Sequence, residues 1–220
     1  MKYRLLNNHY VVEIDGYNFV IDTGSPRSYS FRNDLREVKI LNNNLKLNPA
    51  GYNFDIKKIH KLVGFPVDGL LGKDAFGETG LTFYKENEAG GHVEFTSHNI
   101  EGASFPIAEL LNGYGILIQI DNNKLYLVDT GARYGYGANH MFNGLINFDN
   151  VWDYNPIFGD LYSPIYHVDV EINHKKCHTS ACYNRSVTFP IPNFLMIGNI
   201  TDFFERECCI DYKNRKVIFN

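Results

Sequence analysis

The feature that most constrains this chain is a short motif that occurs twice, once in each half. Residues 19–25 carry the first copy and residues 125–132 the second. In both copies an apolar run, typical of a buried strand, ends on the sequence Asp-Thr-Gly. A buried carboxylate needs hydrogen-bond partners, and glycine permits the sharp turn that brings backbone amides to it. The motif therefore predicts two equivalent loops, which present Asp22 and Asp129.

Each copy is followed, further along the chain, by an apolar segment that ends on glycine. These segments are residues 68–72 (Asp-Gly-Leu-Leu-Gly) and residues 194–198 (Phe-Leu-Met-Ile-Gly). With these four motifs the chain resembles the aspartic peptidases, the pepsin-like and retropepsin-like enzymes that use two Asp-Thr-Gly loops. The resemblance spans nearly the whole chain, although only in these motifs. In that family the glycine segments pack beneath the catalytic loops.

The resemblance implies an all-β, two-lobed acid-protease barrel with a pseudo-twofold internal repeat. Residues 1–103 form the first expected lobe and residues 104–220 the second. The implied activity is that of an aspartic endopeptidase with Asp22 and Asp129 as catalytic residues, without a cofactor or a metal. Six neighbouring residues are expected to support the two loops: Thr23, Gly24, Ser25, Thr130, Gly131 and Ala132. The threonines should brace the loops against each other, and the glycines should offer amides to the carboxylates.

Two close carboxyl groups are what metal-free peptide hydrolysis requires. One accepts a proton from water while the other donates a proton toward the carbonyl oxygen. They must be so close that both cannot ionise readily, and two copies of one loop related by a twofold axis meet this need. Retroviral relatives obtain the second copy by dimerising, whereas this chain carries both, so we expect a monomer.

The order of predicted strands also repeats. Residues 10–14 and 17–21 predict a hairpin that turns at Asp15-Gly16, and residues 116–120 and 125–128 predict its counterpart. Hairpins at residues 81–95 and 209–219 should close the two halves, and residues 96–104 are the best linker candidate. Residues 54–63 are predicted to form a further strand.

A long hairpin is expected between the second acid loop and its glycine segment. Residues 151–160 are rich in aromatic and turn-forming residues, and residues 166–172 predict a strand. In aspartic peptidases a hairpin at this distance is the flap that closes over substrate. Pepsin-like enzymes carry theirs in the first half, but the stretch there, residues 47–52, is shorter. The candidate flap residues are Trp152, Ile157, Phe158 and Gly159, and the alternative for the aromatics is an ordinary core position.

Composition and charge limit the partners. The 220 residues are 44% hydrophobic and 21% charged, which is globular and sufficient for a core. A net charge of −4 gives no reason to expect nucleic acid or an anionic membrane as partner. No run approaches the ~18 apolar residues of a membrane helix, and residues 1–9 lack the apolar centre of a signal peptide. We therefore expect a cytoplasmic protein whose partner is a peptide or unfolded protein substrate.

The four cysteines all lie in the second half, at positions 177, 182, 208 and 209. Their spacing does not resemble a disulfide framework, so free buried or half-buried thiols are expected. Two alternatives stay open. One is a bridge between Cys177 and Cys182, and the other is a metal site made by those two residues with His174 and His178.

Sequence also suggests an asymmetry between the loops and an alternative function. Ser25 follows the first glycine, and a hydroxyl that donates to Asp22 would lower the pKa of that acid. Ala132 cannot do this, so Asp129 is expected to carry the shared proton.

The competing hypotheses are a catalytically silent peptide- or partner-binding module on the same fold, and a one-lobed fold that dimerises. The presence of both acids favours the enzyme over the first, and the paired glycine segments oppose the second.

Overall fold

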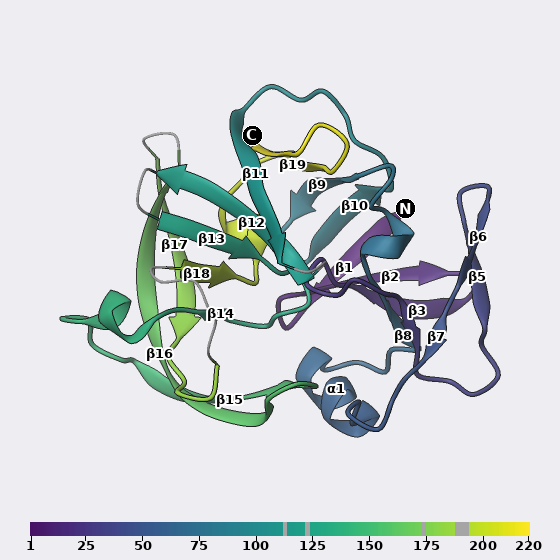
Figure 1. The fold of residues 1–220 in the computed structure, drawn as a ribbon, viewed down its shortest axis with the longest axis horizontal. Coiled ribbons are helices and arrows are strands. Elements are labelled where there is room, and N and C mark those ends of the chain that lie inside the picture. The colour runs from purple at the N-terminus through teal and green to yellow at the C-terminus, as the bar shows by residue number, and fades with distance from the viewer. Residues whose placement is uncertain (112–113, 122–123, 173–174, 188–193) are drawn as a thin grey trace.

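The protein is built mostly from β-strands (Figure 1). The computed structural model describes residues 1–111, 114–121, 124–172, 175–187 and 194–220. It is 51% strand and 9% helix, which confirms the expected all-β class.

The elements follow one another as Figure 1 labels them. Those of the first half are β1 (Lys2–Leu6), β2 (His9–Ile14), β3 (Tyr17–Ile21), β4 (Tyr29–Ser30), β5 (Glu37–Ile40), β6 (Asn43–Lys46), β7 (Asn48–Pro49), α1 (Ile56–Val63), β8 (Gly69–Leu71), the 3₁₀-helix η1 (Lys73–Ala75), β9 (Leu81–Asn87) and β10 (Gly90–Glu94). Those of the second half are β11 (Ala103–Leu111), β12 (Tyr114–Asp121), β13 (Lys124–Val128), β14 (Gly135–Tyr136), η2 (Asn139–Phe142), β15 (Asp149–Asn155), β16 (Gly159–Ile172), β17 (Lys175–Cys182), β18 (Phe194–Ile197), η3 (Ile200–Asp202), β19 (Glu207–Asp211) and β20 (Lys216–Phe219).

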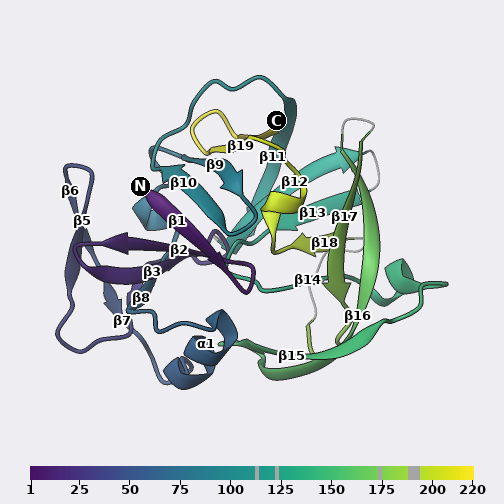
Figure 2. The same cartoon turned by 180° about the vertical axis from the view of Figure 1, so that it is seen from behind.

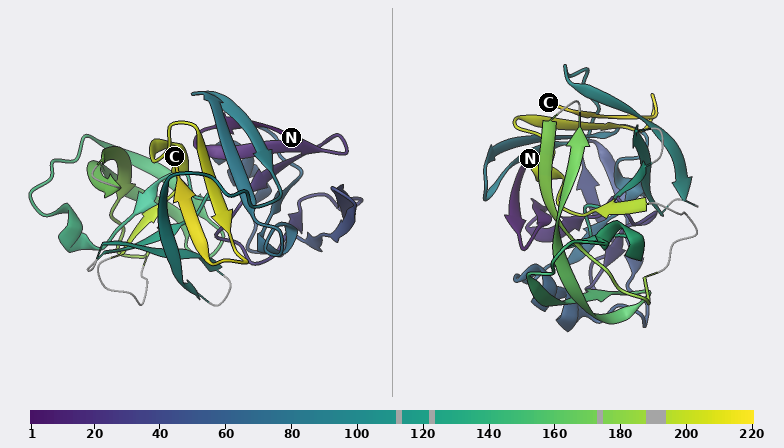
Figure 3. Two further views of the ribbon diagram at one scale, coloured as in Figure 1. Left: turned by 90° about the horizontal axis from the view of Figure 1, so that it is seen from above. Right: turned by 90° about the vertical axis from the view of Figure 1, so that its left-hand side faces the viewer.

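One large sheet runs through the molecule. In the part of the chain that the structure describes it has fourteen strands, in the order β18-β13-β12-β11-β20-β19-β9-β10-β1-β2-β3-β8-β4-β7. The closing hairpins of the two halves meet in its middle, where β19 pairs with β9 and Cys208 lies opposite Phe83. Seen from above, the C-terminal hairpin lies between the strands of the two halves (Figure 3). Smaller sheets consist of β14-β17-β16-β15 and of β5-β6.

The same pairings occur around the two Asp-Thr-Gly motifs. β2 and β3 form an antiparallel hairpin, and β3 then pairs in parallel with β8. In the second half β12 and β13 form the antiparallel hairpin, and β13 pairs in parallel with β18. The predicted turn between β2 and β3 is present, with positive φ angles of 53° at Asp15 and 81° at Gly16. These pairings place each motif at the end of a central, buried strand.

Residues 54–63 do not form the predicted strand, because eight of them belong to helix α1. The side chain of Asp55 accepts a hydrogen bond from the Lys58 amide and so caps the first turn. Gly64, with a φ of 76°, ends the helix in the left-handed conformation. The apolar side chains recur at helical spacing and are buried on one face: Ile59, Leu62 and Val63. The caps and the helical period are both visible in the sequence of residues 55–64.

The core joins the two halves. The largest cluster of buried side chains takes residues from strands of both halves, such as Ile21 and Ile197. A second cluster packs α1 against the first-half sheet and includes Tyr154, which comes from β15. Figures 1 and 2 show the end of β15 beside α1 from both sides. In the described residues no helix is long and apolar enough to cross a lipid bilayer.

The cap of α1 can be tested by replacing Asp55 with alanine. We expect this change to lower the free energy of unfolding by about 1 kcal/mol, because the Lys58 amide loses its acceptor. Asp55→Asn is the matched control, since its side-chain oxygen can still cap. Urea titrations of the three proteins measure the difference, and equal losses in both variants would contradict the capping role.

Candidate active site

The two Asp-Thr-Gly loops are held by equivalent backbone contacts. The amide of Asp22 donates to the carbonyl of Leu71 at 2.9 Å, and the amide of Asp129 donates to the carbonyl of Ile197, also at 2.9 Å. Leu71 ends β8 and Ile197 ends β18, the strands that the two glycine segments form. Each segment therefore lies directly beside its loop, as expected.

A reciprocal set of four hydrogen bonds joins the loops. The Thr23 amide donates to Thr130 Oγ1 and the Thr130 amide donates to Thr23 Oγ1, both at 3.0 Å. Each hydroxyl then donates across the boundary, from Thr23 to the Val128 carbonyl at 3.1 Å and from Thr130 to the Ile21 carbonyl at 2.8 Å. Both threonines are buried. These contacts hold the two loops against each other.

The glycines bring the two acids together. The Gly24 amide donates to Asp22 Oδ1 at 2.9 Å, and the Gly131 amide donates to Asp129 Oδ1 at 3.0 Å. A Cβ atom on Gly24 would overlap the carboxyl group of Asp129, and one on Gly131 would overlap that of Asp22. Each carboxyl group thus packs on the loop of the other half, at a position only glycine can occupy. Both acids are half-buried.

The environment favours the protonated form of this pair. Burial raises the pKa of Asp22 well above its ordinary value, and the charge of Asp129 and a hydrogen bond between the two carboxyl groups raise it further. Burial also raises the pKa of Asp129, against the opposing effect of the Gly131 amide. Two interacting acids titrate as a unit, so the pair retains a proton at a pH where an exposed aspartate has lost its own.

The predicted role of the Ser25 hydroxyl is wrong. Ser25 Oγ donates to the carbonyl of Arg27 at 2.7 Å, because the chain bends at Pro26 and brings that carbonyl within reach. The backbone amides of Ser25 and Ala132 instead take matching positions near the acid of their own loop. The reason for assigning the proton to Asp129 is therefore absent from the structure.

A cavity of about 60 Å³ adjoins Asp22 and Gly131. Its apolar walls come from β3, β8 and α1 and from the phenylalanines at positions 31 and 54. His9 lines it from the start of β2, while Tyr154 and Pro156 line it from the hairpin of β15 and β16. The hairpin of the second half thus covers a cavity that lies mostly in the first half.

The hairpin predicted as the flap is present, with Asn155 opposite Gly159 at its tip. Ile157 is 71% exposed, and Gly159 has a φ of 76°. Phe158 is half-buried against the apolar cluster of the second half.

Trp152, the fourth candidate, is half-buried on the same hairpin and packs against the cluster that includes α1. Its indole N–H donates to Asp160 at 3.0 Å, and the Lys61 ammonium lies 4.4 Å from the ring centroid. None of the four candidate flap residues lines the cavity beside Asp22, which Tyr154 and Pro156 line instead.

Sequence reasoning missed Tyr154, Pro156, α1 and His9. Side chains alternate along a strand, so Tyr154 shares the face of Trp152 and could have been named with it. The helix has its own signals in the Asp55 cap and the apolar spacing. His9 carries no local signal, because its position depends on a turn that meets both halves.

All four cysteines are buried and form no disulfide. The bridge between Cys177 and Cys182 is therefore contradicted, and both residues lie on the same strand, β17. In the described residues no group of three or more histidine, cysteine or acidic side chains is placed to hold a metal. The metal alternative also involves His174, which lies outside the described residues.

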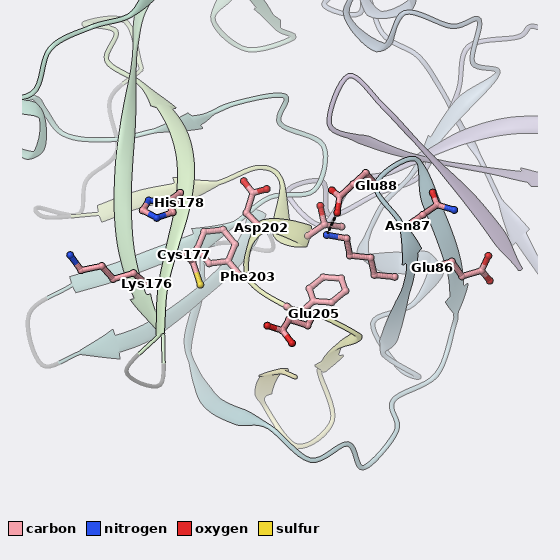
Figure 4. A pocket seen from close by; sticks show the side chains of 12 residues that line it. Glu86, Asn87, Glu88, Lys176, Cys177, His178, Asp202, Phe203 and Glu205 are labelled. Carbon is pink, nitrogen blue, oxygen red and sulfur yellow. Dashed lines mark ion pairs between the residues drawn. The ribbon is translucent and has the colours of Figure 1, made fainter.

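A larger hollow of about 570 Å³ lies elsewhere, between the β9–β10 turn, β17 and the segment that follows β18 (Figure 4). Its labelled side chains include Glu86, Glu88, His178 and Asp202. No residue of either Asp-Thr-Gly loop lines it. The larger hollow and the paired acids are therefore separate features of the molecule.

Comparison with protein-family models gives no match, and comparison with curated proteins gives none either.

Replacing Thr23 by valine tests the contacts between the loops. The Thr130 amide and the Val128 carbonyl would both stay buried but lose their hydrogen bond to the Thr23 hydroxyl. Each lost bond should cost about 1–3 kcal/mol of stability. We expect a loss of about 2–6 kcal/mol in the free energy of unfolding, measured by urea titration. Thr23→Ser keeps the hydroxyl and should lose much less. If both variants lose the same amount, methyl packing and not hydrogen bonding stabilises this site.

The raised pKa values of the acids predict a stability effect of Asp129→Asn. A group whose pKa is higher in the folded than in the unfolded protein makes stability fall as the pH rises between the two values. Removing the group should therefore raise the thermal midpoint at neutral pH, with the gain shrinking as the pH falls through the raised pKa and absent below about 4.

Asp34 provides the control, because Arg32 lowers the pKa of this exposed acid. Asp34→Asn should show no gain at neutral pH. Thermal melts of the two variants and the wild type between pH 3 and pH 8 make the comparison. A loss of stability in Asp129→Asn at neutral pH would contradict the inference.

Proposed function

We propose that this protein is an aspartic-type endopeptidase in which Asp22 and Asp129 activate one water molecule. The proposal rests on one observation: two equivalent loops bring the two acids together. Each carboxyl group packs on the glycine of the opposite loop. The reciprocal threonine hydrogen bonds support it, because they fix the separation of the acids. The sequence resemblance to pepsin-like and retropepsin-like enzymes agrees with this arrangement.

The proposed reaction uses the single proton that the pair retains. The ionised carboxylate takes a proton from water as the water oxygen attacks the peptide carbonyl carbon, and the protonated acid gives its proton to the carbonyl oxygen. A tetrahedral diol results, and the acids have exchanged roles. A proton then passes to the amide nitrogen, the carbon–nitrogen bond breaks, and a carboxylic acid and an amine leave. The raised pKa values favour the singly protonated pair that this cycle requires.

The substrate would be an extended peptide or an unfolded protein segment. Strand β15 lies at the edge of its sheet and covers the cavity beside Asp22, so its backbone can pair with an extended chain. The hairpin of β15 and β16 would act as the flap, with Tyr154 and Pro156 contacting the substrate. The apolar walls of the cavity favour a large apolar side chain next to the scissile bond.

The proposal includes a two-lobed acid-protease barrel with a pseudo-twofold repeat and lobes at residues 1–103 and 104–220. The matching strand pairings around the two motifs support the repeat. Because one chain supplies both acids, the proposed enzyme works as a monomer without a cofactor.

Single replacements of the two acids test the activity. The wild type should cleave peptides in a diverse mixture, and Asp22→Asn or Asp129→Asn should each lower kcat/KM by at least about a thousand-fold, because the water is held between the two acids. Mass spectrometry of the products between pH 3 and pH 8 gives both the rate and the sites of cleavage.

Asp202→Asn is the matched control, since Asp202 lines the larger hollow and not the paired-acid site. It should keep wild-type activity. Cleavage that survives in either acid variant would point to another protease or another site. A wild type that binds peptides and cuts none would support the silent binding module instead.

A further inference from the structure

The turn that precedes His9 is fixed to both sides of the cavity. Asn7 and Asn8 form its corner, with positive φ angles of 46° and 67°. The Asn7 amide group donates to the Leu62 carbonyl of α1 at 3.1 Å, and that of Asn8 donates to the Arg133 carbonyl beyond the second acid loop at 3.0 Å. His9 therefore enters the cavity from a turn with little freedom to move.

The His9 ring is buried but incompletely paired. His9 is only 2% exposed, and its Nδ1 atom lies 3.3 Å from the Leu6 carbonyl oxygen. A carbonyl can only accept, so Nδ1 carries the proton of the neutral ring and Nε2 presents a lone pair. In the described residues Nε2 has no hydrogen-bond partner. Burying a polar atom without a partner costs free energy. The site therefore favours a ligand whose polar group can hydrogen-bond to Nε2.

The His9 ring is neutral at any pH well above its lowered pKa. Burial lowers the pKa of His9 to about 4, although the Leu6 and Gly131 carbonyls oppose this shift. The nearby Arg133 charge lowers it further. An ionic partner is therefore not what this site selects.

The other groups around the cavity limit which kind of side chain can bind there. Its walls are largely apolar, and the hydroxyl of Tyr154 is already engaged with the Asp55 amide at 2.9 Å and the Asn53 carbonyl at 2.6 Å. Asp22 is committed to the proposed reaction. The cavity of about 60 Å³ exceeds the ~10–15 Å³ that one water needs but is smaller than the ~150 Å³ of a cavity that takes benzene. An aromatic ring therefore enters only when the hairpin tip with Tyr154 and Pro156 moves outward. A side chain with an apolar body and one neutral polar tip fits this description.

We propose that His9 determines specificity by binding the hydroxyl group of a substrate tyrosine next to the scissile bond. The inference rests on the proposed peptidase function, and it assigns the cavity beside Asp22 to that side chain. A phenol has an aromatic body for the apolar walls and a hydroxyl that can donate to Nε2. Phenylalanine would fill the same walls and leave Nε2 unpaired.

Peptide pairs that differ only by tyrosine or phenylalanine test the proposal. Each pair places the two residues at one position flanking the cleaved bond, and kcat/KM is measured for every peptide. At one position the wild type should prefer tyrosine by about ten-fold or more, because a site that loses its hydrogen bond rejects the analogue. Equal rates for tyrosine and phenylalanine at every position would overturn the proposal without requiring any variant.

His9→Leu should remove the preference by slowing the tyrosine peptide and sparing the phenylalanine peptide. His9→Gln restores a polar tip and should recover part of the preference, and the exposed His140→Leu is the control that keeps it. A variant that slows both peptides equally would assign His9 a merely structural role.

The two proposals can fail separately. If the wild type cleaves no peptide, the peptidase function fails, and calorimetric binding of the same peptide pairs still tests the cavity. A tyrosine preference in binding would then support His9 as a recognition residue, and equal binding or no binding would overturn it.

Discussion

The reciprocal hydrogen bonds of Thr23 and Thr130 are the interaction on which the site depends. Each threonine is at once the partner of the opposite amide and of a carbonyl on the opposite strand. Because all four contacts lie in the buried interior, none can be lost without leaving a polar group unpaired. The two strands that carry the acids are thereby fixed to each other as well as to their neighbours in the sheet, β8 and β18. The separation of Asp22 and Asp129 follows from this connection and from the two glycines on which the carboxyl groups pack.

The same closeness makes the site a source of instability. Burial and mutual repulsion raise the pKa of the acids, so that their full ionisation is disfavoured in the folded protein. The amides of Gly24 and Gly131 offset part of this cost by donating to the carboxyl groups. The large common core stabilises the fold against the rest of this cost. In that core the closing hairpins of both halves share one sheet. An arrangement that is unfavourable for stability but specific in geometry is typical of reactive sites.

The parts of this structure that could be predicted from sequence are those encoded locally. The acid loops, the strands before them and the covering hairpin follow from alternation, turn residues and a repeated motif. Helix α1 also has local signals, in its caps and its apolar spacing, so the strand prediction for residues 54–63 is an error that the sequence itself could have prevented. Other features depend on distant contacts. The Ser25 hydroxyl turned to Arg27, and His9 lies beside Asp22 only because its turn contacts Leu62 and Arg133. Such pairings have no signature in a single sequence.

The contacts of the covering hairpin differ in strength along its length. Beside Tyr154 in β15, Asp153 accepts a hydrogen bond from the buried Tyr136 hydroxyl at 2.8 Å. Toward its tip, Asp160 forms an exposed ion pair with Lys58 of α1, a kind of contact that contributes little. The Tyr154 hydroxyl adds two hydrogen bonds to the chain before α1, worth about 1 kcal/mol each. Opening of the tip away from α1 would break these contacts and expose Tyr154, which is buried in the cluster that packs α1 on the first-half sheet. The Tyr136 contact would still hold β15 to β14. Opening of this kind would admit a chain to the cavity beside Asp22, and it would leave the threonine contacts that hold the acids untouched.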